Sequence, residues 1–480
     1  MSISEITSKY KDDLKVLEVS SRINTNKNSV FFSGLSGNLD VILPLSVSQK
    51  DKLSHCFVLS DKEKALIFYS NLCNFLDKNK VYFFPFSFLS PYDDDLLNNA
   101  NVVMRTEAIQ AVVSRKKEKI YIVTYPEGLF EKFPSEKFQN KLSLSIEKKQ
   151  KLNIKSIRNT LVERGFSLED FITQPGDLAI RGNIIDVFSY SYKNPIRIEM
   201  DGDFVEKIKV FDVESQLTIK EVESVMVVSN LQSNEESKEY LSLFGFFDSK
   251  WCIWADSVSL SANIIDEKHL KSLELFKKTQ KKSNVLLKLP PEKIFLDKDS
   301  YLKEILAFKL VETQNKSIKK SQNVHFNSSP QPNFNKNLSL LADNLKDLEE
   351  KGYIIHISFQ SEEQVLRLTS YFESIGLTTK VKMLITKLSE GFVDHENKVV
   401  FYTDHQIFNR YYKHSFQPKV IKKQKNPIND RSELNTGDYV VHIDHGVGRF
   451  VGLEKIKSNE IEHEVLRVVY KNNDVVYINI

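Results

Sequence analysis

The stretch SGLSGNLDVILPL, residues 33–45, follows the apolar run VFF and is typical of a strand that passes through a glycine turn into a helix. A phosphate loop, G-x-x-x-x-G-K-[ST], uses such a turn. Its glycines let backbone N–H groups surround the phosphates, its Lys reaches the terminal phosphates and its hydroxyl holds Mg²⁺. Gly34 and Gly37 are present, but Asp40 and Val41 stand where Lys and Ser or Thr are required. An aspartate repels a triphosphate and a valine cannot ligate magnesium. We therefore expect either an ordinary strand–turn–helix or a degenerate phosphate loop that binds no nucleotide.

The composition of the whole chain is that of an ordinary globular protein. Its 480 residues predict three or four domains at about 100–200 residues each. The net charge of +3 gives no case for a continuous polyanion-binding surface. Cys56, Cys73 and Cys252 are too widely spaced for a disulfide framework or a cysteine-rich zinc site, which favours a reducing compartment. Neither a signal peptide nor a membrane-spanning run is evident, so we expect a cytoplasmic protein without membrane contact.

The rhythm of apolar residues divides the chain into parts. Short β-rich runs alternate with amphipathic segments up to about residue 125, which predicts βα units around a largely parallel sheet. A helical segment and strands with period-two alternation then predict an inserted antiparallel α+β domain. A Pro/Ser/Asn-rich segment, NSSPQPNFNKN, marks the next boundary, and the tail is all β. The predicted parts are 1–125 with 219–326 (α/β), 126–218 (inserted α+β), 327–415 (a further α/β domain), 416–433 (basic linker) and 434–480 (β tail).

Two short polar motifs could supply metal ligands, but neither predicts a metal site. PYDDD, residues 91–95, has no histidine or further fixed acid nearby in sequence, so a solvated loop that caps the next helix is expected. HIDH supplies His442 and His445, whereas a zinc site needs three or four ligands, so a strand end turning at Gly446 is expected. We find no Ser/His/Asp or Cys/His arrangement in the sequence, and we expect this chain not to be an enzyme.

The segment RGNIIDVF, residues 181–188, has two interpretations. Arg181 precedes a strand in which Ile184, Asp186 and Phe188 share one face. An acid within an apolar face is either a structural partner of a neighbouring-strand arginine such as Arg197, or part of a partner-binding face. The sequence leaves both interpretations open.

Longer segments resemble a known family. The tail, GDYVVHIDHGVGRFVGLEKI with EVLRVVYKNNDVVYINI, resembles the RNA-polymerase-interacting domain of bacterial transcription-repair coupling factors, an SH3-like barrel shared with CarD-type regulators. PGDLAIRGNIIDVFS with PIRIEMDGDFVEKIKVFDVESQLT resembles the UvrA-binding domain that these factors share with the excision-repair protein UvrB. SPQPNFNKN and VVFYTDHQIFNRY are similar to family segments between those domains. In the family the UvrB-like module keeps the fold but has lost the ATP site of UvrB, and GLSGNLDV fits that loss.

The resemblance implies a fold class and a function. The fold class is α/β: a degenerate UvrB-like, P-loop-like parallel-sheet domain with an inserted UvrA-binding α+β domain, a further α/β domain, and a CarD-type barrel truncated at its C-terminus. The implied function is that of a monomeric adaptor in transcription-coupled nucleotide excision repair, which binds the RNA polymerase β subunit and UvrA. The family continues into a superfamily-2 DNA translocase. We expect ATP, Mg²⁺, helicase-like activity and most DNA binding to belong to that missing part, and no cofactor to belong to this chain.

The same resemblance assigns site residues. UvrA binding is expected at Arg181, Asp186 and Phe188, although the family's upstream basic contact falls here on GFSLED, which carries Ser167 and Leu168 instead. In EVLRVVY one set of alternate side chains is buried by the barrel and the other set is left near the surface, unless both are buried. Family analogy selects the set containing Leu466. The polymerase-binding residues expected are Leu466, Val468 and Arg449.

Two rival functions come from other classes. A UvrB-like DNA-repair ATPase would need a working phosphate loop, and Asp40 together with the absence of a recognisable Walker B or helicase motif series argues against it. A stand-alone CarD-type transcription regulator would need only the tail, and the long preceding part of the chain argues against that.

Overall fold

The computed structural model forms two compact units, Met1–Val420 and Ile421–Ile480. The residues that the structure describes are 10–24, 30–87, 99–114, 118–135, 143–213, 215–228, 239–281, 289–313, 322–410, 412, 436–442, 446–458, 461–470 and 474–479. The motif PYDDD and His445 lie outside the described residues, as does the side chain of His442.

The first unit is built on a seven-stranded sheet in which every neighbouring pair is parallel. Its strands are short apolar runs, and β2, β4 and β15 are buried at every position, as expected of a sheet covered on both faces. This confirms the predicted mixed α/β class with a parallel sheet. In sheet order the strands are β17 (Gln322–His325), β1 (Val30–Ser33), β16 (Lys309–Glu312), β15 (Trp251–Ala255), β2 (Ser54–Val58), β4 (Tyr121–Thr124) and β3 (Val81–Phe84).

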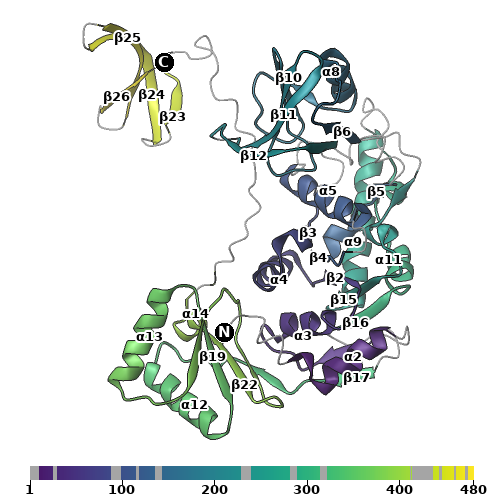
Figure 1. Ribbon diagram of the computed structural model, residues 1–480, viewed down its shortest axis with the longest axis vertical. Coiled ribbons are helices and arrows are strands. Elements are labelled where there is room, and N and C mark those ends of the chain that lie inside the picture. The colour runs from purple at the N-terminus through teal and green to yellow at the C-terminus, as the bar shows by residue number, and fades with distance from the viewer. Residues whose placement is uncertain are drawn as a thin grey trace. The chain divides into compact units, whose positions relative to one another are not determined.

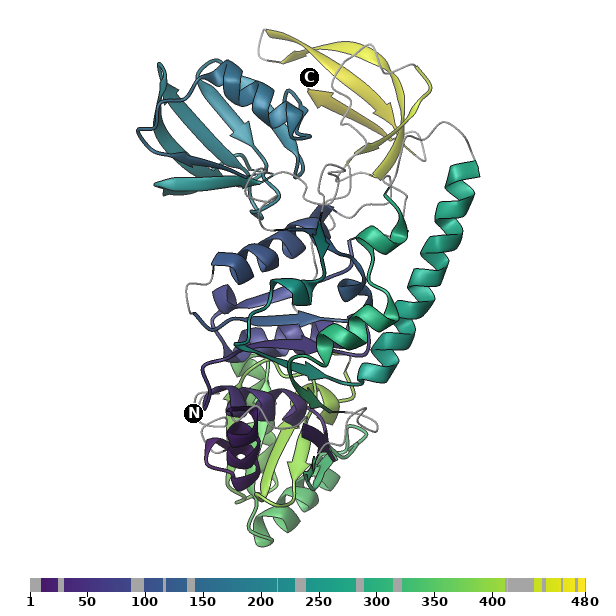
Figure 2. The ribbon, with the colours of Figure 1, turned by 90° about the vertical axis from the view of Figure 1, so that its right-hand side faces the viewer.

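Helices cover the two faces of this sheet and create two apolar cores (Figure 1). One core contains residues of α2 (Leu14–Asn24), α3 (Leu39–Ser48) and α4 (Lys62–Phe75). The other contains residues of α5 (Asn99–Ser114) and α9 (Val258–Lys281), and α9 runs along one side of the sheet (Figure 2). The smaller elements here are η1 (Lys78–Lys80), α6 (Pro126–Phe130), β5 (Phe133–Pro134), β14 (Tyr240–Leu241), η3 (Leu243–Phe246), α10 (Pro291–Ile294) and α11 (Lys298–Ile305).

Within its described residues, the inserted domain is an antiparallel sheet with one helix, α8 (Ile154–Glu163). Side chains along β10 alternate between buried and partly exposed, which is the pattern of a sheet with one face on a core. The sheet order is β12 (Thr218–Val222), β11 (Phe204–Phe211), β10 (Ile196–Asp201), β9 (Ile184–Val187), β8 (Asp177–Arg181) and β7 (Ser167–Leu168), the last pair being parallel.

The packed elements of the inserted domain do not follow the predicted limits 126–218. Strand β6 (Ser143–Glu147) pairs with β13 (Ser224–Val228), and Val225 and Val227 belong to the core of the inserted domain. Phe130 and Phe133, by contrast, pack into a core of the central sheet. The strand that closes the inserted domain therefore lies beyond the predicted C-terminal limit, because it pairs with a strand about 80 residues earlier.

The third part of the first unit is a five-stranded sheet with helices α12 (Leu338–Glu350) and α13 (Glu362–Ser374) packed against β19 (Figure 1). The Pro/Ser/Asn-rich segment, predicted as a boundary, contributes the edge strand β18, which pairs with β21. The sheet order is β18 (Ser328–Pro330), β21 (Phe392–Asp394), β22 (Val399–Thr403), β19 (Ile354–Phe359) and β20 (Val381–Ile385); helix α14 (Asp404–Ile407) follows β22.

The second unit is a four-stranded antiparallel sheet, which confirms the predicted β character of the tail. Strand β24 carries an irregularity between Phe450 and Gly452, and Gly452 has a φ of 142° that favours glycine at this bulge. The strands, in both sheet and chain order, are β23 (Tyr439–His442), β24 (Gly446–Ser458), β25 (Ile461–Val469) and β26 (Val475–Asn479).

Candidate functional sites

The glycine turn after β1 is a site of close backbone contact. Gly34 and Gly37 have φ values of 77° and 52°, in the region that favours glycine. A Cβ on Gly34 would lie 2.0 Å from the carbonyl oxygen of Phe326, and a Cβ on Gly37 would lie 2.4 Å from that of Gly391. Both glycines are therefore required by neighbouring protein backbone and do not by themselves indicate a phosphate.

The start of helix α3 is in contact with the third part of the same unit. Asn38, which precedes α3, is only 2% exposed. Its backbone N–H donates to the Glu390 carbonyl at 3.3 Å, and its side-chain Oδ1 accepts from the Glu390 N–H at 2.8 Å. Its Nδ2 donates to Ser389 Oγ at 3.3 Å. The helix terminus that an intact loop offers to a phosphate is thus bonded to protein.

The space beside this contact has the wrong charge for a nucleotide. A cavity of about 300 Å³ is lined by four carboxylate side chains, those of Asp40, Asp61, Glu63 and Glu390, and by the single ammonium of Lys64. Burial is the largest cause that raises the pKa of Asp40, to about 7, although part of this residue remains exposed. These residues do not fit a triphosphate, because its oxygens would meet four carboxyl groups and a single lysine.

Asp256 is an acidic residue at this edge that the sequence analysis missed. It directly follows β15, and in parallel α/β sheets ligands bind at the carboxyl ends of the strands. Its carboxylate accepts from Lys64 Nζ at 2.8 Å, from the Ser60 N–H at 2.9 Å and from Thr313 Oγ1 at 3.0 Å. Protein groups therefore occupy this carboxylate at the end of the strand. An aspartate directly after an apolar strand was the available sequence indication.

The structure supports the structural interpretation of Asp186. Asp186 is 1% exposed and accepts two hydrogen bonds from Arg197, from Nε at 2.7 Å and from Nη2 at 2.9 Å. Arg181 Nη2 donates to the same carboxylate at 2.6 Å. Phe188 is also only 1% exposed, because it packs in a small core with Ile172. The expectation that Asp186 and Phe188 form an exposed face is therefore wrong, and only Arg181 of the three reaches the surface.

An aromatic residue that the sequence analysis did not select lies beside Arg181. The Arg181 guanidinium carbon is 5.3 Å from the centroid of the Phe171 ring. The Arg181 side chain is 44% exposed and Phe171 is 64% exposed. We call Arg181 and Phe171 the arginine–aromatic surface.

In the second unit, the register of the strands decides which face is covered. Val468 is 1% exposed and pairs with the buried Phe450, and Leu466 on the same face is partly buried. The expectation that Val468 lies on a binding surface is therefore wrong, because Val468 is buried beside Phe450. Arg449 is exposed and lies on the opposite face.

The opposite face of this sheet carries solvent-exposed apolar side chains. Tyr439 pairs with Arg449, and Val441 pairs with Val447, so the four share one face. Tyr439 is 80%, Val441 77% and Val447 63% exposed. We call Tyr439, Val441, Val447 and Arg449 the open face of the second unit. An apolar open face on a small sheet is typical of a binding surface.

Comparison with known proteins finds a family match for the inserted domain and another for the second unit. Residues 144–232 match the UvrB interaction domain, and residues 434–480 match the CarD-like/TRCF RID domain. Over 99% of its length the chain is 23% identical to the transcription-repair-coupling factor of Borreliella burgdorferi. Its relatives are transcription-repair coupling factors. Those of Rickettsia conorii and Bacillus subtilis are each 24% identical, over 89% and 67% of this chain.

The similarity to the coupling factors covers only part of each relative. The chain spans 44% of the Borreliella burgdorferi protein and 43% of the Rickettsia conorii protein. The match to the UvrB interaction domain begins within β6 and ends after β13, and so follows the packing of the inserted domain. The recognition made from the sequence is confirmed.

Among the described residues, no cluster of three or more His, Cys, Asp or Glu side chains is arranged to hold a metal ion. No helix in the described ranges has the length and apolar character needed to cross a bilayer.

Proposed function

We propose that this chain is the adaptor portion of a transcription-repair coupling factor, acting as a monomer that binds UvrA through its inserted domain and the RNA polymerase β subunit through its second unit. One observation carries the proposal: a UvrB interaction domain and a CarD-like/TRCF RID domain occur in one chain. Such a chain can hold a stalled polymerase and a repair protein at the same time. A stand-alone CarD-type regulator has no use for the first of these domains.

Under this proposal, the ATP-driven DNA translocase lies outside residues 1–480. ATP, Mg²⁺ and most DNA contacts would belong to a translocase that this sequence does not include, and the whole would work in the cytoplasm with RNA polymerase. The degenerate UvrB-like module then serves as a scaffold for the inserted domain. The second unit would be the described part of a small SH3-like barrel.

The arginine–aromatic surface is the best candidate for the UvrA contact. Arginine and aromatic side chains dominate the energetics of protein interfaces. Asp186 holds Arg181 at 2.6 Å and Phe171 lies under its guanidinium, so the side chain is ordered before a partner arrives. Binding then costs less conformational entropy than it would for a free arginine.

The test measures UvrA binding by biolayer interferometry with the whole chain. Arg181→Ala and Phe171→Ala should each weaken binding about 10-fold or more, corresponding to about 1.4 kcal/mol. Arg158→Ala, which removes an exposed arginine from α8 of the same domain, is the matched control and should bind normally. If both variants are folded and bind as tightly as the control, UvrA contacts another surface.

The open face of the second unit is the best candidate for the polymerase contact. Tyr439 and Val441 are exposed on the edge strand β23, and Val447 is exposed on the neighbouring strand β24. Such exposure is costly in a free protein and is explained by a partner that covers these side chains. Val441→Arg should abolish binding to the polymerase β subunit in a pull-down, because the added guanidinium would be desolvated without a partner. Leu453→Arg, which changes an exposed leucine that pairs with Leu466 on the other face, is the control. Loss of binding in the control alone would place the contact on that other face.

A further inference from the structure

We propose that the degenerate phosphate loop is a docking site for residues 387–391 of the third part of the unit, with the Glu390 carbonyl accepting the hydrogen bond that an intact loop offers to a phosphate. The inference does not rest on binding to UvrA or to polymerase. We call residues 387–391 the docking segment.

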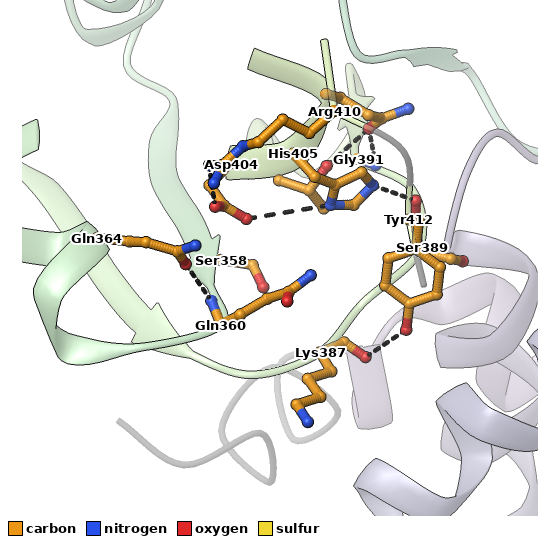
Figure 3. A network of polar contacts seen from close by, with 12 residues as sticks. Ser358, Gln360, Gln364, Lys387, Ser389, Gly391, Asp404, His405, Arg410 and Tyr412 are labelled. Atoms are coloured by element: carbon orange, nitrogen blue, oxygen red, sulfur yellow. Dashed lines mark hydrogen bonds and ion pairs between the residues drawn. The ribbon is translucent and has the colours of Figure 1, made fainter. Parts of the chain in front are cut away.

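The docking segment is held in shape by its own domain (Figure 3). Buried His405 donates from Nε2 to the Ser389 carbonyl at 2.8 Å, and Tyr412 donates from its hydroxyl to the Lys387 carbonyl at 3.3 Å. The Gly391 N–H donates to Gln406 Oε1 at 2.7 Å. Three anchors over five residues present the segment as a preformed surface, so little conformational entropy is lost when it contacts the loop.

The outer side of the docking segment is complementary to the loop. The Asn38 side chain and backbone together bond both polar backbone groups of Glu390, and Asn71 Nδ2 on α4 donates to Ser389 Oγ at 2.9 Å. Asn74 Nδ2 donates to the Lys387 carbonyl at 2.5 Å. The Glu390 carbonyl carries partial negative charge to the N-terminus of α3, as a phosphate oxygen would.

Apolar contacts surround these hydrogen bonds. Leu384, Leu388 and Phe392, on either side of and within the docking segment, belong to the same apolar core as Leu39 and Val41 of helix α3. The side chain that replaces the magnesium-ligating hydroxyl is thus packed in this shared core. The substitution that removes the nucleotide site also supplies apolar contact area for docking.

Further contacts outside the loop orient the third part. Tyr10 donates to Asp394 Oδ2 at 2.8 Å within the protein, and Asn397 Nδ2 donates to Asp13 Oδ2 at 2.9 Å. Neither hydrogen bond involves a residue of the phosphate loop or of the docking segment. The loop contact can therefore be weakened by mutation while the domains stay attached, which makes it testable in the whole chain.

The first experiment is hydrogen–deuterium exchange of the whole chain followed by mass spectrometry. Asn38→Ala should raise amide exchange about 10-fold or more both in residues 34–42 and in the docking segment, because the side-chain hydrogen bonds to Ser389 and Glu390 are lost. Ser389→Ala should raise exchange in the same two segments by a smaller factor. Asn79→Ala, an exposed asparagine of the same module, is the control. Exchange within β19 should not change.

The outcomes separate docking from a local structural role. If Asn38→Ala raises exchange in residues 34–42 alone, or in neither segment, the proposal is wrong. If that variant proves unfolded by circular dichroism, Ser389→Ala decides, because it alters the contact from the other side. Equal exchange in the docking segment of Ser389→Ala and the control would then overturn the proposal.

The second experiment restores the phosphate-loop residues by the triple change Leu39→Gly, Asp40→Lys and Val41→Thr. Docking and nucleotide binding exclude one another under the proposal. Calorimetry should detect no binding of Mg·ATP, or binding that is accompanied by loss of exchange protection in the docking segment. Binding of Mg·ATP with full protection of the docking segment would contradict the proposal.

Discussion

At the scale of single residues, Asp40 shows how a lost site changes the electrostatics of a protein. It stands at the lysine position of a phosphate loop and faces a cavity rich in carboxylates. Burial, with Asp256 and Glu390, raises its pKa to about 7 from the usual 3.8, and Lys64 opposes the rise. The folded protein thus keeps a proton on Asp40 at pH values where the unfolded chain has released it.

This shift predicts a pH dependence of stability. Between about pH 4 and pH 7 the folded state binds more protons than the unfolded state, so the free energy of unfolding falls as the pH rises. Asp40→Asn should therefore stabilise the protein at pH 8 by roughly 1–3 kcal/mol, an amount reduced by the partial exposure of the side chain, and should have little effect at pH 4. Urea unfolding at the two pH values measures the difference. Glu63→Gln, in the same cavity, is the control, and an equal effect of Asp40→Asn at both pH values would contradict the prediction.

Asp186 is the second residue whose environment predicts a measurable effect. Arg197→Ala should lower the free energy of unfolding by about 2–4 kcal/mol, because it leaves a buried carboxylate with only the half-exposed Arg181 as partner. Arg181→Ala should cost about 1 kcal/mol or less, since Arg197 keeps both of its hydrogen bonds. Chemical denaturation of the two variants side by side tests this order. A larger cost for Arg181→Ala would show that Arg181 is the main partner of Asp186.

At the scale of elements, β25 shows why the alternation of side chains along a strand does not predict which face is buried. Alternation predicts correctly that Leu466 and Val468 share a face. The covered face is this one, because Phe450 of β24 pairs with Val468 and both are buried. The surface that remains open belongs to the other set of side chains.

This arrangement predicts opposite effects of the same substitution on the two faces. Val468→Asp should strongly increase amide exchange throughout β24 and β25, because a carboxylate buried without a partner costs several kcal/mol. Val447→Asp, on the open face, should leave exchange unchanged. Hydrogen–deuterium exchange of the whole chain provides the measurement. Similar exchange in both variants would mean that the sheet is open on both faces.

At the scale of the whole molecule, the two compact units predict separable functions. Removal of residues 421–480 should abolish polymerase binding, while UvrA affinity and the urea midpoint of the remaining unit stay unchanged, because each unit is compact by itself. Binding assays and urea unfolding of the shortened and complete chains test this. A lower midpoint in the shortened chain would show that the second unit stabilises the first.

The sequence by itself determined the parallel α/β class, the β character of the tail and the resemblance to the transcription-repair coupling factors. These depend on local patterns: apolar runs bounded by turns, period-two alternation, and long similar segments. The departure at Asp40 and Val41 was also evident, because a phosphate loop requires particular side chains at fixed spacing. Local chemistry was sufficient for each of these predictions.

Only the tertiary structure decided which predicted residues reach the surface. Phe188 is buried in a small core, and Val468 is buried beside its cross-strand partner Phe450. Phe171 became a candidate because the fold brings it to Arg181. The contact between Asn38 and Glu390 joins residues 352 positions apart. Periodicity shows which side chains share a face, but the covered face and the distant partner depend on how separate elements pack together.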